Sequence, residues 1–115
     1  MPSDYDDRWT GVSIPEIEWH FHARLLERYD IILNPGEFSR MLKLIKEDRA
    51  PVVHRNPPSR IVAFRRNFDS KLIFVAVMGV RPLTALPPTR QLHRSWVRLS
   101  KELRSGASFF SDHYI

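Results

Sequence analysis

Residues 20–28 carry polar side chains whose types and spacing suit chemistry on a phosphate group. His20, Arg24 and Arg28 recur every four residues, which places them along one stripe of a helix. Guanidinium groups beside an imidazole favour its neutral form, which can accept a proton. Arginines also hold phosphate groups and stabilise charge that develops on them. We therefore take His20 as a candidate general base, with His22 on the same helix as the competing histidine.

Further cations and a hydroxyl group follow in segments of extended character. Arg65 and Arg66 are adjacent, so their side chains should point to opposite faces of a sheet, one of them toward the helices. Thr84 places a hydroxyl on one face of the last extended segment. The catalytic candidates are therefore His20, His22, Arg24, Arg65 and Thr84, while Arg28, Arg55 and Arg66 are candidate nucleic-acid contacts.

A row of cations follows near the end of the chain. Arg90, Arg94, Arg98 and Lys101 step by four, four and three residues, and Glu102 is the acid that opposes them. Cations on one stripe of a helix can follow a phosphate backbone. The alternative is an ordinary solvated helix face. We add these four residues to the candidate nucleic-acid contacts.

Other kinds of site are excluded by composition or spacing. The chain has no cysteine, so it has no disulfide, thiolate nucleophile or zinc–thiolate site. Its four glycines are well separated and form no phosphate-binding loop. His20 and His22 point in different directions on a helix and form a poor chelating pair. We therefore expect no metal and no cofactor, and metal-free cleavage of RNA by histidine, arginine and threonine fits these residues best.

The charge is divided unevenly along the chain. The 115 residues have a formal net charge of +5. Residues 1–48 hold six basic and ten acidic side chains, whereas residues 49–115 hold twelve basic and three acidic ones. The basic region favours a polyanionic partner such as RNA. Because no apolar run approaches the roughly 20 residues of a membrane helix, we expect a cytoplasmic protein without a membrane partner.

Two helices are expected before the first extended segment. Residues 1–13 should be a flexible arm. Ser13 and Pro15 favour a helix start, and the stripe of Ile14, Ile17, Phe21 and Leu25 predicts a helix over residues 15–29. Asn34 and Glu37 form a capping pattern that opens a second helix, which should end near Arg49.

The remaining chain predicts a sheet and a third helix. Strands are expected at residues 51–55, 60–66, 71–78 and 82–86, joined by short turns as an antiparallel meander. Leu92, Trp96, Leu99 and Leu103 predict a helix from the Thr89 cap to Arg104. The fold class is therefore α+β: two N-terminal helices packed on a four-stranded antiparallel sheet, with a C-terminal helix. Residues 14–105 should form one domain, followed by a tail over residues 106–115.

This layout resembles the small toxins of the barnase–EndoU–colicin–RelE superfamily, particularly the BrnT- and RelE-like branches. The resemblance covers about residues 15–90. It rests on His20-Phe-His-Ala-Arg24-Leu-Leu-Glu-Arg28, on Asn34-Pro35-Gly36-Glu37, on Arg65 with Arg66, and on Thr84 before Leu86-Pro87-Pro88-Thr89-Arg90. It implies a ribonuclease-like fold, metal-independent RNA cleavage and an antitoxin partner, in a toxin–antitoxin or phage-borne setting.

Three features depart from those toxins and leave a second hypothesis open. His22 competes with His20 for the position of the base, the segment around Met78–Pro82 is more apolar than in the family, and the third helix is long with an aromatic tail. The alternative is a non-catalytic phage or mobile-element protein that binds a host protein or nucleic acid. Such a partner would contact Trp19, Leu26 and the acidic N-terminal half.

Overall fold

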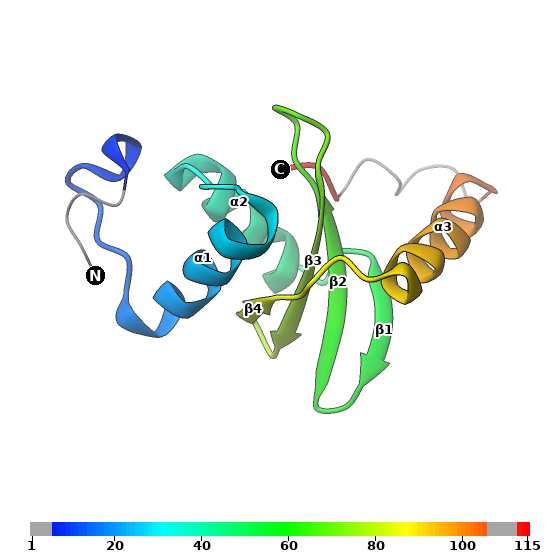
Figure 1. The fold of residues 1–115 in the computed structure, drawn as a ribbon. Helices are drawn as coiled ribbons and strands as arrows, with labels where there is room; N and C mark the ends of the chain where they lie inside the picture. Colours follow the sequence, from blue (N-terminus) through cyan, green and yellow to red (C-terminus); the bar gives the residue numbers. More distant parts are fainter. Residues whose placement is uncertain (1–5, 106–112) are drawn as a thin grey trace.

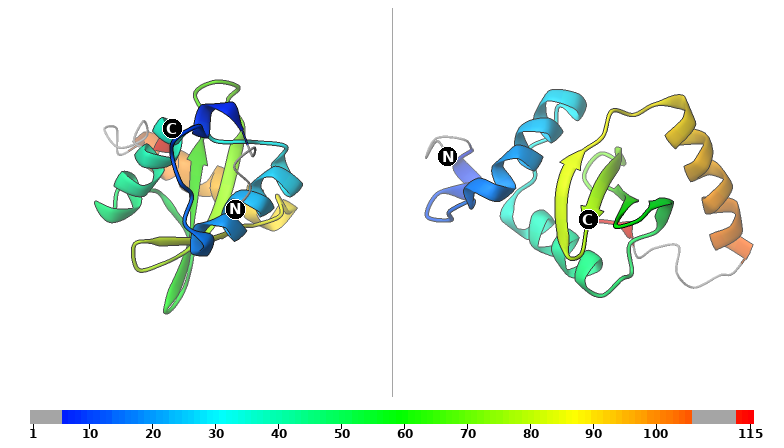
Figure 2. Two further views of the ribbon diagram at one scale, coloured as in Figure 1. Left: turned by 90° about the vertical axis from the view of Figure 1, so that its left-hand side faces the viewer. Right: turned by 90° about the horizontal axis from the view of Figure 1, so that it is seen from below.

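The computed structural model describes residues 6–105 and 113–115, which form three layers. Two helices cover one face of a central sheet, and a third helix lies against the other face (Figures 1 and 2). The α+β arrangement predicted from the sequence is thereby confirmed. In chain order the elements are η1 (Asp7–Trp9), α1 (Glu16–Tyr29), α2 (Pro35–Lys46), β1 (Val52–Asn56), β2 (Ser59–Arg65), β3 (Leu72–Met78), β4 (Arg81–Ala85) and α3 (Arg90–Ser105).

Local sequence explains where α2 begins and where α1 ends, whereas the Ser13 cap expected for α1 is not formed, because Pro15 is the N-cap residue and makes no side-chain cap hydrogen bond. In α2 the Asn34 side chain accepts a hydrogen bond from the Glu37 N–H at 2.8 Å, and the Glu37 carboxylate accepts one from the Asn34 N–H at 2.9 Å. This reciprocal cap satisfies backbone donors that the first turn leaves unpaired. Helix α1 ends where Asp30 adopts a left-handed conformation with φ of 55°.

The buried face of α1 differs from the expected one. Phe21, His22 and Leu25 are buried, whereas Ile17 is 60 % exposed. The predicted apolar stripe began at Ile14, which is buried but precedes the first residue of α1. Its position therefore does not follow the helical period. Ile17 lies roughly a quarter-turn from the centre of the face that is buried.

The sheet is an antiparallel meander in the order β1-β2-β3-β4, as expected. Strand β3 is central and covered on both faces. Ile73, Val75 and Val77 belong to the main core, which also contains the buried residues of α1 and α2. Phe74 points the other way and packs in a smaller cluster with Trp96 of α3.

The main core also includes residues outside the elements predicted from the sequence. Trp9 is buried, and its indole Nε1 donates a hydrogen bond to the Leu33 carbonyl at 2.7 Å. Ile115 is buried too, and its N–H donates to the Arg65 carbonyl at 2.9 Å. The expected arm and tail therefore each contribute a side chain to the core. Residues 1–5 and 106–112 of those two segments lie outside the described residues.

Candidate nucleic-acid interface

His22 is a core residue. Its side chain is 0 % exposed, and its ring lies 4.5 Å from Phe38, 5.3 Å from Trp9 and 5.4 Å from Phe21, measured between ring centroids. Burial lowers the pKa of His22 from 6.5 to about 4, because desolvation penalises the charged imidazolium. The side chain is thus neutral near pH 7, but no substrate can reach it in this conformation.

The other polar residues of α1 do not converge on one site. His20 is exposed. The Arg24 guanidinium forms an ion pair with Glu27 at 2.6 Å, and Arg28 donates a hydrogen bond to the Ala85 carbonyl at 2.7 Å. Arg28 therefore ties the end of α1 to the end of β4.

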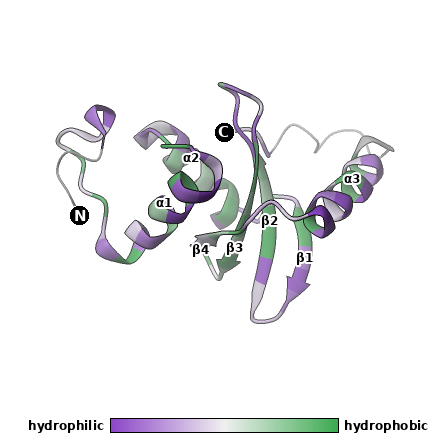
Figure 3. Ribbon diagram, viewed as in Figure 1, coloured by the Kyte–Doolittle hydropathy of each residue, from purple (hydrophilic) through white to green (hydrophobic). Residues whose placement is uncertain are grey.

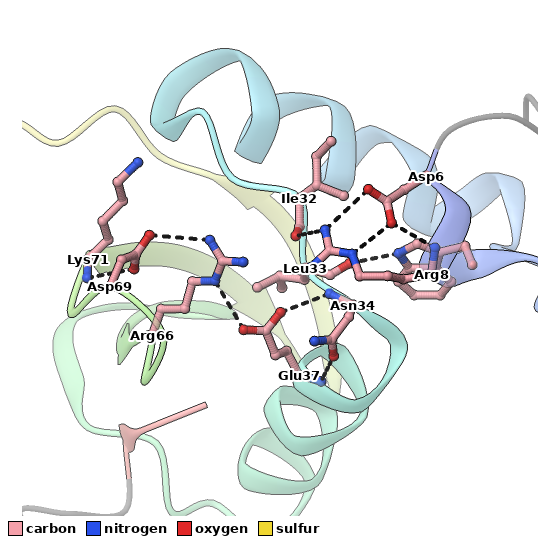
Figure 4. A network of polar contacts seen from close by, with 10 residues as sticks. Asp6, Arg8, Ile32, Leu33, Asn34, Glu37, Arg66, Asp69 and Lys71 are labelled. Atoms are coloured by element: carbon pink, nitrogen blue, oxygen red, sulfur yellow. Dashed lines mark hydrogen bonds and ion pairs between the residues drawn. The ribbon is translucent and has the colours of Figure 1, made fainter.

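Arg66 lies inside a network of charged side chains (Figure 4). It is only 8 % exposed, with Nε 3.0 Å from a Glu37 carboxylate oxygen and Nη1 3.3 Å from Asp69. The Phe68 ring covers its guanidinium at 5.2 Å. Two carboxylates thus neutralise this cation, and Arg66 links the start of α2 to the β2–β3 turn.

Arg65 points to the opposite face, as the adjacency of the two arginines predicted. Its guanidinium donates to the Ser70 carbonyl at 2.8 Å and borders a cleft of about 440 Å³ between the sheet and the first turns of α3. We call this space the cationic cleft, because its lining includes the cations Arg65, Arg90 and Arg94, with His93 beside them. Leu72, Phe74, Pro88 and Thr89 complete the lining.

Among the described residues, no acid balances the charge of the cationic cleft. The part of the lining that the structure describes has no carboxylate, and the first turn of α3 has no acidic residue. Within residues 6–105 and 113–115, neither Arg90 nor Arg94 forms an ion pair. Both cations stand at the positive end of the helix dipole, where a negative charge is favoured. The cleft is therefore electrostatically suited to an anion.

Two smaller hollows lie along the other flank of α3. The first, of about 320 Å³, shares Thr89 with the cleft and also contacts His54 of β1. The second, of about 340 Å³, shares His54 and Ser95 with the first and is bordered by Arg98 and Glu102. Both hollows lie between α3 and β1 or its neighbour β2, and the second is the more polar of the two. Figure 3 shows hydrophilic residues along much of the visible side of α3.

The remaining candidates fall on both sides of the sheet. Arg98 and Lys101 are exposed on α3, in the row predicted from the sequence. Thr84 is half-buried and pairs with Ala76, one position before Ala85 of the main core, so its side chain faces the α3 side. Arg55 is exposed near the β1–β2 hairpin.

The structure thus divides the residues expected to act together. Arg65 and Thr84 face α3, whereas the α1 candidates His20, His22 and Arg24 lie on the helix that packs beside β4 and the main core. The structure instead places Arg65 beside the same cleft as Arg90 and Arg94, the first two residues of the basic row on α3. His93 in this cleft was missed, because it lies between members of the four-four-three spacing. The sequence signal that could have found His93 is its position three residues after Arg90, which places both residues on one helix face.

The partner residues and other candidate sites can also be placed. Trp19 is half-buried and Leu26 is 37 % exposed on α1. No three acidic or histidine side chains among the described residues form a group that could hold a metal ion. No helix in this part of the chain is long and apolar enough to cross a membrane.

Comparison of the chain with protein-family models, curated proteins and solved structures gives no significant match. The resemblance to RelE-like toxins is therefore supported only by the α+β fold and its four-stranded antiparallel sheet. The site must be interpreted from its own chemistry.

Proposed function

We propose that this protein binds RNA through the cationic cleft and the basic row of α3. The observation that carries the proposal is the cleft itself, where cations from β2 and from α3 border one space and no described lining residue is a carboxylate. Arg98 and Lys101 extend the exposed positive surface beyond it. Phosphate groups are the natural ligands of such a surface, because arginine offers several donors in a planar fork and retains its charge.

The arrangement of charge in the fold supports the same proposal. Helices α1 and α2 lie on one side of the sheet, and α3 lies on the other (Figure 2). The sheet therefore separates the four acidic residues of α1 and α2 from the basic row of α3. A polyanion can approach α3 without meeting those acids directly.

A salt titration tests RNA binding directly. Binding of a fluorescently labelled single-stranded RNA is measured by anisotropy at a series of salt concentrations. Affinity should fall steeply as salt rises, because bound cations displace counterions from the phosphates; about four phosphate contacts give a logarithmic slope near −3. An affinity that does not change with salt, or the absence of binding at low salt, would contradict the proposal.

RNA cleavage is the second candidate function, and one observation favours a specific base for it. His93 is the histidine that borders the cationic cleft, beside arginines able to stabilise a phosphorane. In such a reaction the imidazole takes the ribose 2′-hydroxyl proton, and the 2′ oxygen attacks phosphorus. The bond to the 5′ oxygen then breaks, and that oxygen takes a proton from water.

A matched pair of histidine variants tests this second function. His93→Gln should abolish cleavage of a labelled RNA, whereas His20→Gln, on exposed α1 surface, should leave it unchanged. Equal cleavage by both variants and the wild type would exclude His93 as the base. Loss of cleavage in His20→Gln alone would return the base to α1, as the sequence resemblance implied.

Protein binding through α1 is retained as the alternative function because Leu26 is exposed and shares a helix face with Trp19. A partner held there by apolar contacts should bind with little dependence on salt. Leu26→Ser should weaken that interaction in a pull-down with a candidate partner and leave RNA binding intact.

A further inference from the structure

The cationic cleft concentrates positive charge more strongly than the rest of the basic surface. Arg98 and Lys101 succeed one another along α3, so each can meet a different phosphate of a bound strand. In the cleft, three guanidinium groups and one imidazole border a single space of about 440 Å³. Arg65 enters from the sheet and the other three from α3, so the charges stand on two sides of that space.

The positive charge around the cleft exceeds the single negative charge of an internal RNA phosphate. An internal phosphodiester carries one negative charge and two free oxygens. A terminal phosphate carries close to two negative charges near pH 7 and presents three acceptor oxygens. Three guanidinium groups match the three oxygens and compensate the larger charge, and each can form charge-assisted hydrogen bonds.

The uncharged lining of the cleft suits the rest of a terminal nucleotide. Leu72, Phe74 and Pro88 provide apolar surface beside the arginines. The cleft volume lies within the range of small-molecule sites, so it can hold more than a bare ion. A ribose and base carried by a terminal phosphate would contact this apolar surface.

We propose that the cationic cleft recognises the terminal phosphate of an RNA strand, with the terminal nucleotide against Leu72, Phe74 and Pro88. The inference rests on the RNA binding proposed above and specifies which part of the strand the cleft takes. The remaining nucleotides extend over the exposed face of α3, where Arg98 and Lys101 follow Arg94 in the basic row.

The test compares end-modified forms of one short single-stranded RNA. Anisotropy titrations at fixed salt use RNA with a 5′-phosphate, with a 3′-phosphate and with hydroxyl groups at both ends, the label being internal. One phosphorylated form should bind about tenfold more tightly than the hydroxyl form, as expected for added charge-assisted hydrogen bonds. Which form gains affinity identifies the end that is bound.

Two arginine variants on the same helix assign the preference to the cleft. Arg90→Gln removes a cleft cation that forms no ion pair with the described residues, so it should reduce the tenfold preference to about threefold or less. Arg98→Gln removes a cation of the last hollow and should weaken all three RNAs equally, leaving the preference intact.

The outcomes separate this inference from the function on which it rests. Equal affinity for the three RNAs, with a steep salt dependence, would overturn terminal-phosphate recognition and leave RNA binding in place. Failure of all three to bind would overturn both proposals. A phosphoserine peptide that binds as tightly as the preferred RNA would overturn recognition of an RNA end in favour of a phosphoprotein ligand.

Discussion

At the scale of single residues, His22 shows how burial changes the role of a side chain that could do chemistry. Its ring lies among Trp9, Phe21 and Phe38 in the main core. Trp9 reaches this position because its indole is held by the Leu33 carbonyl. The His22 side chain thus packs between η1, α1 and α2. Its neutral form is favoured there, because burial penalises the charged imidazolium.

The lowered pKa of His22 makes stability depend on pH. Above pH 6.5 the imidazole is neutral in both folded and unfolded chains, so His22 imposes no penalty. As the pH falls from 6.5 to about 4, the unfolded chain takes up a proton that the folded core excludes, so unfolding becomes more favourable. His22 should remove about 3 kcal/mol of stability over this window, measured by urea unfolding at successive pH values.

Two substitutions in α1 show whether this pH dependence belongs to His22. His22→Leu should remove most of the loss between pH 6.5 and 4, whatever its effect on stability at pH 7. His20→Gln changes an exposed histidine two residues away and should leave the loss in place. An unchanged pH profile in His22→Leu would assign the effect to other groups.

At the scale of elements, Glu37 fastens α2 to the sheet while capping it. One carboxylate oxygen accepts the Asn34 N–H at 2.9 Å, and the other lies 3.0 Å from Arg66 Nε. Arg66 also reaches Asp69 in the β2–β3 turn at 3.3 Å. The same side chain therefore completes a helix cap and joins a nearly buried ion-pair network.

Replacing Glu37 should reveal the energetic contribution of that network. Glu37→Gln retains a side-chain acceptor for the cap but leaves Asp69 as the one carboxylate partner of Arg66 among the described residues. A loss of about 2 kcal/mol in the free energy of unfolding is expected, because hydrogen bonds to buried charges contribute about 1.5–3 kcal/mol. Chemical denaturation measures the change.

The surface pair on α1 provides the matched control. Glu27→Gln removes the charge partner of Arg24, but both side chains are substantially exposed. The change should cost no more than about 0.5 kcal/mol, as is usual for solvent-exposed helix pairs. Equal losses in the Glu37 and Glu27 variants would mean that burial does not strengthen the Arg66 network.

At the scale of the whole molecule, the sheet separates the basic row of α3 from the two N-terminal helices. Helices α1 and α2 hold four acidic and five basic side chains, whereas α3 carries the exposed basic row on the other side (Figure 1). The second hydrophobic cluster, centred on Trp96, holds α3 against the sheet. RNA binding is therefore proposed as a property of one side of the molecule.

Neutralising α3 should change the salt dependence of RNA binding without changing the fold. The triple variant Arg90→Gln, Arg94→Gln, Arg98→Gln removes three exposed cations that form no ion pair within the described residues. The logarithmic salt slope should become shallower by about 2, and the thermal midpoint should stay nearly constant. An unchanged slope would place the phosphate contacts elsewhere.

Sequence patterns by themselves determined the α+β fold, because its elements are encoded locally. The Asn34–Glu37 cap, the apolar run of β3 and the spacing of Leu92, Trp96 and Leu99 each follow from short-range backbone geometry. The exposed row on α3 followed from the same helical period. The adjacency of Arg65 and Arg66 correctly predicted that they face opposite sides of the sheet.

Only the tertiary structure decided which of these side chains share a site. His22 is buried because Trp9, from outside the predicted domain, packs against it, and no local pattern reports that contact. Arg66 is neutralised by Glu37, 29 positions away in the chain, whereas Arg65 borders the same cleft as Arg90 and His93. The burial and the charge pairing of a side chain depend on neighbours that are distant in sequence. Sequence periodicity therefore identified the candidate site residues, but only the packing showed which of them lie in one site.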